Sequence, residues 1–171
     1  MRGSCKKVKA IGWLCAFLVT SSYAVDDPKY LVRDVINERK DIISYVDTNK
    51  MARITLGKKR NSFTKEQMEE FVDMFEVVIA QSYNRFILNS RRKIDLLSTK
   101  YSGNIAVVSG RLDGLNVKFM LYLDKQQEWK IYNLVIDGIN YGILYRTIYK
   151  ESIEMCGVEE FLLKLRKKLG S

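Results

Sequence analysis

The fold is decided by residues 104–136, which read NIAVVSGRLDGLNVKFMLYLDKQQEWKIYNLVI. Apolar and more polar side chains alternate along residues 104–111 and 115–123. This period of two predicts β-strands. One face of the second segment carries Val117, Phe119, Leu121 and Leu123, and the other carries Lys118, Met120 and Tyr122. The dipeptide Asp113-Gly114 between the segments favours a two-residue turn. The stretch therefore predicts an antiparallel hairpin with one dry face and one wetter face.

Two more strands are expected on either side of this hairpin. Residues 94–99 precede it through a turn at Ser102-Gly103, and residues 129–136 follow it through a turn at 125–128. The last segment is apolar on both faces, which is typical of a central strand. The sequence thus predicts a four-stranded antiparallel sheet.

Helical periodicity dominates the chain before the sheet. Asp27 and Pro28 form a helix start, and apolar residues then recur at helical spacing from Leu31 to Val46. A short segment, 51–56, separates them from a second start, where Thr64 and Gln67 form a capping box. The apolar face of that second helix consists of Phe71, Val72, Phe75, Val78, Ile79 and Tyr83.

The helical period returns after Gly138, breaks at Gly157 and resumes as far as Leu169. The order of helices, strands and helices predicts an α+β fold. We expect N-terminal helices, a four-stranded curved antiparallel sheet and C-terminal helices, arranged as a cone that encloses an apolar cavity.

The first 24 residues have the features of a cleavable secretory signal. Four basic residues precede an apolar run at 10–20, and Ser22-Tyr23-Ala24 is a small-x-small cleavage pattern. The apolar run is shorter than the about 20 residues of a membrane-spanning helix. We therefore expect residues 25–171 to be a single exported domain.

Removing this segment leaves 25 basic and 20 acidic residues, a net charge of +5 on 147 residues. Cys156 is then the last cysteine, so no intramolecular disulfide is expected, and we assign it a structural role in the core. Basic clusters lie at 58–60, 91–93 and 164–168. In an exported protein such clusters favour transient contact with an anionic membrane surface or an acidic partner over binding to nucleic acid. The alternative is that they are solvated residues at helix ends and turns with no partner.

Several chemistries are excluded or disfavoured. The chain contains no His, so Ser-His-Asp and Cys-His catalysis and the usual histidine-bearing metal sites are impossible. It also lacks a P-loop and a GxGxxG motif. One enzymatic alternative stays open, a small cone-shaped isomerase that would use Asp95, Asp137 or Tyr132 at a cavity floor. Another alternative is an exported adaptor with no ligand, a filled core and an exposed apolar patch.

Several collinear motifs resemble one known family. MARITLG at 51–57 is followed by Thr64, Gln67, Phe71, Phe75 and Tyr83, which resembles the pattern MARYTLG, T-x-x-Q-x-x-x-F-x-x-x-F, Y of the MlaC or toluene-tolerance family. WKIYNLVIDGI at 129–139 is similar to that family's W-K-V-Y-D-V-x-I-E-G-V-S segment. Tyr145-Arg146 and GVEEFL at 157–162 are similar to its ending. The similarity runs over about residues 28–169. Asn133, Asp137 and Asn140 depart from its usual Asp, Glu and Ser, which puts the local turn contacts in doubt.

The resemblance implies a nuclear-transport-factor-two-like cone that acts as a periplasmic phospholipid carrier. It also implies two partners, an outer-membrane lipoprotein complex and an inner-membrane ABC transporter with an MCE-domain subunit. The phospholipid would be cargo, and we expect a monomer with no cofactor, no metal and no enzymatic activity.

Physical chemistry supports a carrier independently of the family. Exposing two acyl chains to water costs about 0.8 kcal/mol per CH₂, or on the order of 20 kcal/mol, so an apolar cavity must shield them. We expect the cavity to be lined by Phe75, Val78, Phe119, Leu121, Ile131, Ile139, Tyr141, Leu144 and Ile148. Arg53 and Arg146 are candidates for its mouth or for a buried pairing.

Overall fold

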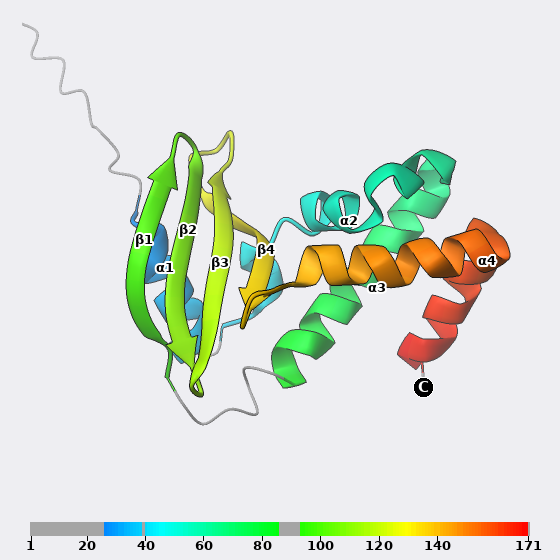
Figure 1. Ribbon diagram of the computed structural model, residues 1–171. Coiled ribbons are helices and arrows are strands. Elements are labelled where there is room, and N and C mark those ends of the chain that lie inside the picture. The colour runs from blue at the N-terminus through cyan, green and yellow to red at the C-terminus, as the bar shows by residue number, and fades with distance from the viewer. Residues whose placement is uncertain (1–25, 39, 86–92, 171) are drawn as a thin grey trace, which may run out of the picture.

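The computed structural model describes residues 26–38, 40–85 and 93–170, and it is an α+β fold as predicted. Helix α1 lies against one side of an antiparallel sheet, and α2, α3 and α4 form a helical layer beyond strand β4 (Figure 1). The helical elements are α1 (Pro28–Asn37), η1 (Ile42–Tyr45), α2 (Thr48–Leu56), η2 (Gly57–Ser62), α3 (Lys65–Tyr83) and α4 (Tyr141–Gly170). The strands, which pair in sequence order, are β1 (Asp95–Ser102), β2 (Ile105–Leu112), β3 (Leu115–Leu123), β4 (Trp129–Ile136) and β5 (Ile139–Asn140).

The hairpin of β2 and β3 confirms the prediction from the central stretch. Leu112 pairs with Leu115 across a turn in which Asp113 and Gly114 have φ angles of 53° and 83°. Two consecutive residues in the left-handed region are what a two-residue hairpin turn requires. Val117, Phe119 and Leu121 are buried on one face of β3.

The predicted strand count was wrong, because the structure has a fifth strand. Ile136 of β4 pairs with Ile139 of β5 across Asp137 and Gly138, whose φ angles are 46° and 82°. The carboxylate of Asp137 accepts a hydrogen bond from the Asn116 N–H at 2.8 Å and ties the turn to β3. The sequence signal was the dipeptide Asp-Gly, the same one that marks the β2–β3 turn.

Residues 129–136 lie between two strands of the sheet, as predicted, although the neighbour on one side is short. One side of β4 pairs with β3, whereas the other meets only the two-residue β5 and a single bridge to Val46. The register shifts by one residue at Tyr132, because Leu121 pairs with Ile131 and Met120 with Asn133. This bulge explains why strict alternation gave apolar residues on both faces of the strand. After the bulge, the residues that point to the core change from odd to even positions.

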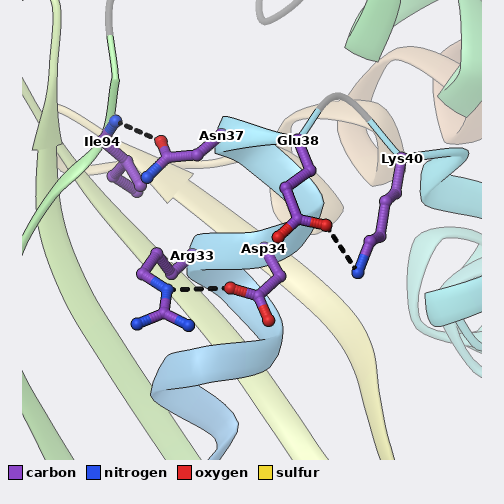
Figure 2. A network of polar contacts seen from close by, with 6 residues as sticks. All are labelled: Arg33, Asp34, Asn37, Glu38, Lys40 and Ile94. Carbon is purple, nitrogen blue, oxygen red and sulfur yellow. Dashed lines mark hydrogen bonds and ion pairs between the residues drawn. The ribbon is translucent and has the colours of Figure 1, made fainter.

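Helix α1 is shorter than the periodicity suggested. Asp27 caps it as predicted, but it ends at Asn37, and Asp41 caps the separate turn η1 by accepting from the Ile43 N–H at 3.1 Å. The Asn37 side chain accepts a hydrogen bond from the Ile94 N–H at 3.0 Å and joins the helix end to the start of β1 (Figure 2). The apolar residues after this end therefore belong to a new segment, which packs near β4.

Two ion pairs flank this junction on its exposed side. Arg33 pairs with Asp34 at 2.8 Å and Lys40 pairs with Glu38 at 2.9 Å (Figure 2). Both are solvent-exposed pairs, which typically contribute well under about 1 kcal/mol. The Asn37–Ile94 bond thus adds to the packing of Val32, Val35 and Ile36 in the apolar cluster that joins α1 to the sheet.

Helix α2 is fastened to the sheet at its first residues. The Asp47 N–H donates to the Ile131 carbonyl at 2.9 Å, and the Asp47 carboxylate caps α2 and accepts a hydrogen bond from the Tyr122 hydroxyl. Lys50 Nζ lies 3.2 Å from the centroid of the Tyr122 ring, within cation–π range. Burial, followed by the bond to Asp47, raises the pKa of Tyr122 to about 12.

Helix α4 contains the predicted break at Gly157, where φ is 78° and ψ is 172°. The break lets the last part of the chain turn back beside α3 (Figure 1). Phe161 then packs against Tyr149, with ring centroids 5.2 Å apart, and against Phe71. Cys156 is partly buried beside the break, and its thiol donates to the Ser152 carbonyl at 3.0 Å. Among the described residues, no helix is both long and apolar enough to span a membrane.

Candidate functional site: an apolar cavity between the sheet and the helical layer

A cavity of about 300 Å³ lies where the sheet meets the helical layer. Its lining comes from six elements and the residues that adjoin them: η1, α2, α3, β3, β4 and α4. The lining residues are Ile42, Val46, Met51, Thr55, Phe75, Val78, Ile79, Ser82, Tyr83, Arg85, Phe119, Ile131, Leu134, Ile136, Tyr141, Gly142 and Tyr145.

The cavity exists because the core is divided into two clusters. One cluster joins α1, η1 and the sheet, and the other joins α2, α3 and α4. Ile79 of α3 packs against both clusters, so the helix passes from one to the other at this point. Side chains of the two clusters meet there without filling the space between them.

The cavity has an apolar, buried interior and a polar, exposed end. Phe75, Phe119 and Ile131 are only 1%, 4% and 4% exposed, respectively. Ser82 and Arg85, by contrast, are exposed. Tyr83 is buried, and its hydroxyl donates to the Val35 carbonyl at 2.9 Å, which satisfies this polar group within the apolar interior. The arrangement suits a ligand with a long apolar part and a polar end.

Five of the nine residues expected to contact lipid line this cavity: Phe75, Val78, Phe119, Ile131 and Tyr141. The bulge in β4 is what brings Ile131, Leu134 and Ile136 to the same cavity wall. Contact with lipid itself stays a prediction for all five residues.

The other four residues lie elsewhere. Leu121 is fully buried in the cluster of α1 and the sheet and does not line the cavity. Ile139, Leu144 and Ile148 are 53%, 40% and 48% exposed, because they lie on β5 and on the outward side of α4. Leu144 and Ile148 were misplaced because the sequence does not show how α4 is rotated about its axis, and Ile139 because it lies in β5.

Neither arginine expected at the mouth lines the cavity. The guanidinium of Arg146 donates to the Ile54 carbonyl from Nε at 2.9 Å and from Nη2 at 2.5 Å, so it holds α4 against α2. Arg53 is exposed on α2. Arg146 therefore makes a pairing within the protein, as one of its two hypotheses expected, but the pairing is exposed and not buried.

Sequence reasoning missed Ser82, Arg85 and Tyr145. The signal was the helical spacing of α3, because Ser82 and Arg85 follow Phe75 and Val78 at intervals that return to the same side of a helix. Tyr145 lies opposite them, and its hydroxyl is 3.5 Å from Ser82 Oγ. These three residues supply polar groups at the exposed end.

The residues named for an isomerase are not brought together. Asp95 is exposed at the start of β1, Asp137 lies in the β4–β5 turn, and Tyr132 lies near Lys50. None of the three lines the cavity, and its lining includes no Asp or Glu among the residues described. The described part of the chain likewise holds no cluster of acidic and cysteine side chains suited to a metal ion.

A second hollow, of about 610 Å³, lies beside α1 and the β3–β4 turn. Its lining carries both signs of charge, including Asp34, Lys40 and Glu128. Burying acyl chains against such groups would strip them of water, which is unfavourable. The smaller cavity is therefore the better candidate for an apolar ligand.

Comparison with known proteins agrees with the fold. The solved structure of a phospholipid-binding protein from Ralstonia solanacearum, in complex with a phospholipid, superposes with a TM-score of 0.63 at 17% sequence identity. The match covers 85% of this chain and 89% of that one. At this identity the match establishes the α+β fold.

A curated relative adds sequence similarity. The intermembrane phospholipid transport system binding protein MlaC of Haemophilus influenzae is 30% identical over 124 residues, which are 67% of this chain and 56% of the relative. The matched part thus spans little more than half of that protein. The model of the family described as MlaC protein matches residues 23–167 and confirms the resemblance seen in the motifs. The chain therefore belongs to the MlaC family.

Proposed function

We propose that this protein is a phospholipid carrier that holds acyl chains in the cavity between α3, β4 and α4. The observation that carries the proposal is the cavity itself, apolar and buried at one end and polar and exposed at the other. Membership of the MlaC family and the names of the two similar proteins support it.

The energetics of the cavity suit a carrier. Each methylene removed from water contributes about 0.8 kcal/mol, so a dry wall of aromatic and branched side chains stabilises the bound chains. A volume of about 300 Å³ is at the lower end for pockets that hold drug-sized ligands. A diacyl lipid is larger than such ligands, so we infer that α3 and α4 move apart from the sheet on loading.

We further propose that the protein works in the periplasm and binds lipid without catalysis. The basic and apolar parts of residues 1–24, which lie outside the described residues, support export. The proposed partners are an outer-membrane lipoprotein complex and an inner-membrane ABC transporter with an MCE-domain subunit. The word "intermembrane" in the name of the curated relative supports this placement.

Transfer between vesicles tests the proposal. Donor vesicles carry a fluorescent phospholipid quenched by its neighbours, acceptor vesicles carry none, and the mature chain is added at a concentration far below that of the lipid. We expect fluorescence to rise at a rate proportional to the protein concentration. Transfer no faster than in buffer alone would contradict the proposal.

A further inference from the structure

The cavity carries one charged side chain among its described lining residues, that of Arg85. Thr55 and Ser82 are its uncharged hydroxyl residues other than tyrosines. A guanidinium next to an apolar cavity is a feature that acyl chains alone do not require. Because Arg85 is exposed, its charge is accessible to an anionic group of a ligand at this end of the cavity.

The surroundings of Arg85 suit an oxyanion. Ser82 lies in the last turn of α3, three residues before Arg85, and the Ser82 and Tyr145 hydroxyls lie 3.5 Å apart. Two hydroxyls can donate to an anion beside a guanidinium, whose fork of N–H groups matches phosphate oxygens. All three residues line the cavity, and Ser82 and Arg85 are exposed.

The other arginines near this region are not available for this task. Arg146 is bound to the Ile54 carbonyl, and Arg53 lies on α2 outside the cavity lining. Arg85 also lies two residues beyond the C-terminal end of α3, where a nearby cation is favoured by the helix dipole. That effect stabilises the helix whatever the ligand, so it predicts no preference among lipids.

We infer that Arg85, together with the hydroxyls of Ser82 and Tyr145, binds the phosphate of a lipid headgroup at the mouth of the cavity. This inference rests on the proposed function and adds a specificity to it. The phosphate contact makes the site discriminate against a neutral diacylglycerol with the same chains.

Competition for a bound fluorescent acyl probe without a charged group tests the inference. The mature chain is titrated with phosphatidylglycerol and, separately, with diacylglycerol of identical chains. Each lipid is supplied in detergent micelles, at a detergent concentration that does not itself displace the probe. We expect Arg85→Gln to weaken phosphatidylglycerol about tenfold and to change diacylglycerol less than twofold. Arg85→Lys should retain part of the preference, because it keeps the charge but not the fork.

The matched control is Arg60→Gln, which removes the same charge from an exposed position in η2, away from the cavity. It should leave both affinities unchanged. Equal losses for the two lipids in Arg85→Gln, or the same loss of phosphatidylglycerol in Arg60→Gln, would overturn the inference. If neither lipid displaces the probe from the unmodified protein, the carrier proposal fails instead.

Inorganic phosphate provides the last arm, because free phosphate shares the chemistry of the headgroup. We expect millimolar phosphate to leave probe binding and phosphatidylglycerol affinity unchanged within twofold, since it lacks the chains that hold the ligand. Tight binding of phosphate alone that is lost in Arg85→Gln would assign the site to a free anion and overturn the lipid assignment.

Discussion

Asn133 is the residue whose side chain holds the start of α4 against the sheet. It is buried, and its carbonyl oxygen accepts from the N–H groups of Leu134 at 2.9 Å and Gly142 at 3.2 Å. Its amide donates to Asn140 Oδ1 at 3.0 Å, and the same oxygen of Asn140 accepts from the Ile143 N–H. Two departures from the family pattern, Asn133 and Asn140, thus contact each other. The sequence showed each departure but not that they are partners.

A double-mutant cycle tests this pairing. Asn133→Asp would place a carboxylate against the Asn140 carbonyl oxygen, two acceptors with no proton between them, and we expect it to lower the free energy of unfolding by about 1–3 kcal/mol. Adding Asn140→Ser supplies a hydroxyl donor and should recover part of this loss. Urea unfolding measures both values; strictly additive effects would show that the two side chains are not coupled.

Tyr122 makes stability depend on alkaline pH. Its pKa is 10 in the unfolded chain and about 12 in the folded protein, so its contribution is complete below pH 10 and is lost as the pH rises towards 12. We expect Tyr122→Phe to flatten the fall in the free energy of unfolding between pH 10 and pH 12. Urea unfolding at several pH values measures it, and parallel curves for the two proteins would contradict this role.

At the scale of elements, the sequence predicted most of the secondary structure. Strands β3 and β4 begin and end at the predicted residues, and the break in α4 falls at Gly157. The end of α1 was missed because apolar residues at 42–46 continue its spacing, although they pack as a separate turn. β5 was missed because two residues are too few for a visible alternation. The dipeptide Asp137-Gly138 could have indicated this strand, because the same dipeptide at Asp113-Gly114 was interpreted as a hairpin turn.

Gly157 is expected to be essential for the shape of α4. Its φ of 78° and ψ of 172° fall in a region that is essentially limited to glycine. Gly157→Ala should therefore lower the free energy of unfolding by about 1–3 kcal/mol, although a Cβ atom there would meet no neighbouring atom within 4 Å. Thermal unfolding checks this, with Gly170→Ala as the control, because Gly170 also has free space but no strained φ. Equal small effects at the two sites would contradict the account.

At the scale of the whole molecule, the sequence predicted a cone with an apolar interior but not the full wall of its cavity. Alternation along β3 correctly gave Phe119, and the apolar face of α3 gave Phe75 and Val78. Leu134 and Ile136 were not predicted to line the cavity. The bulge at Tyr132 changes which side chains of β4 point to the cavity, and a single sequence does not show a bulge. The rotation of α4 about its axis depends on contacts such as Arg146 with Ile54, which join distant segments.

The central claim is that acyl chains occupy the cavity between α3, β4 and α4. Val78 lines this cavity, whereas its neighbour Val77 is 43% exposed on α3 and lies outside it, so the two provide a matched pair. The decisive measurement is native mass spectrometry of Val78→Trp and Val77→Trp, each purified from cells in parallel with the unmodified protein. We predict phospholipid adducts on the unmodified chain and on Val77→Trp, and their loss from folded Val78→Trp. Equal lipid occupancy in both variants, or none in any of the three proteins, would contradict the account.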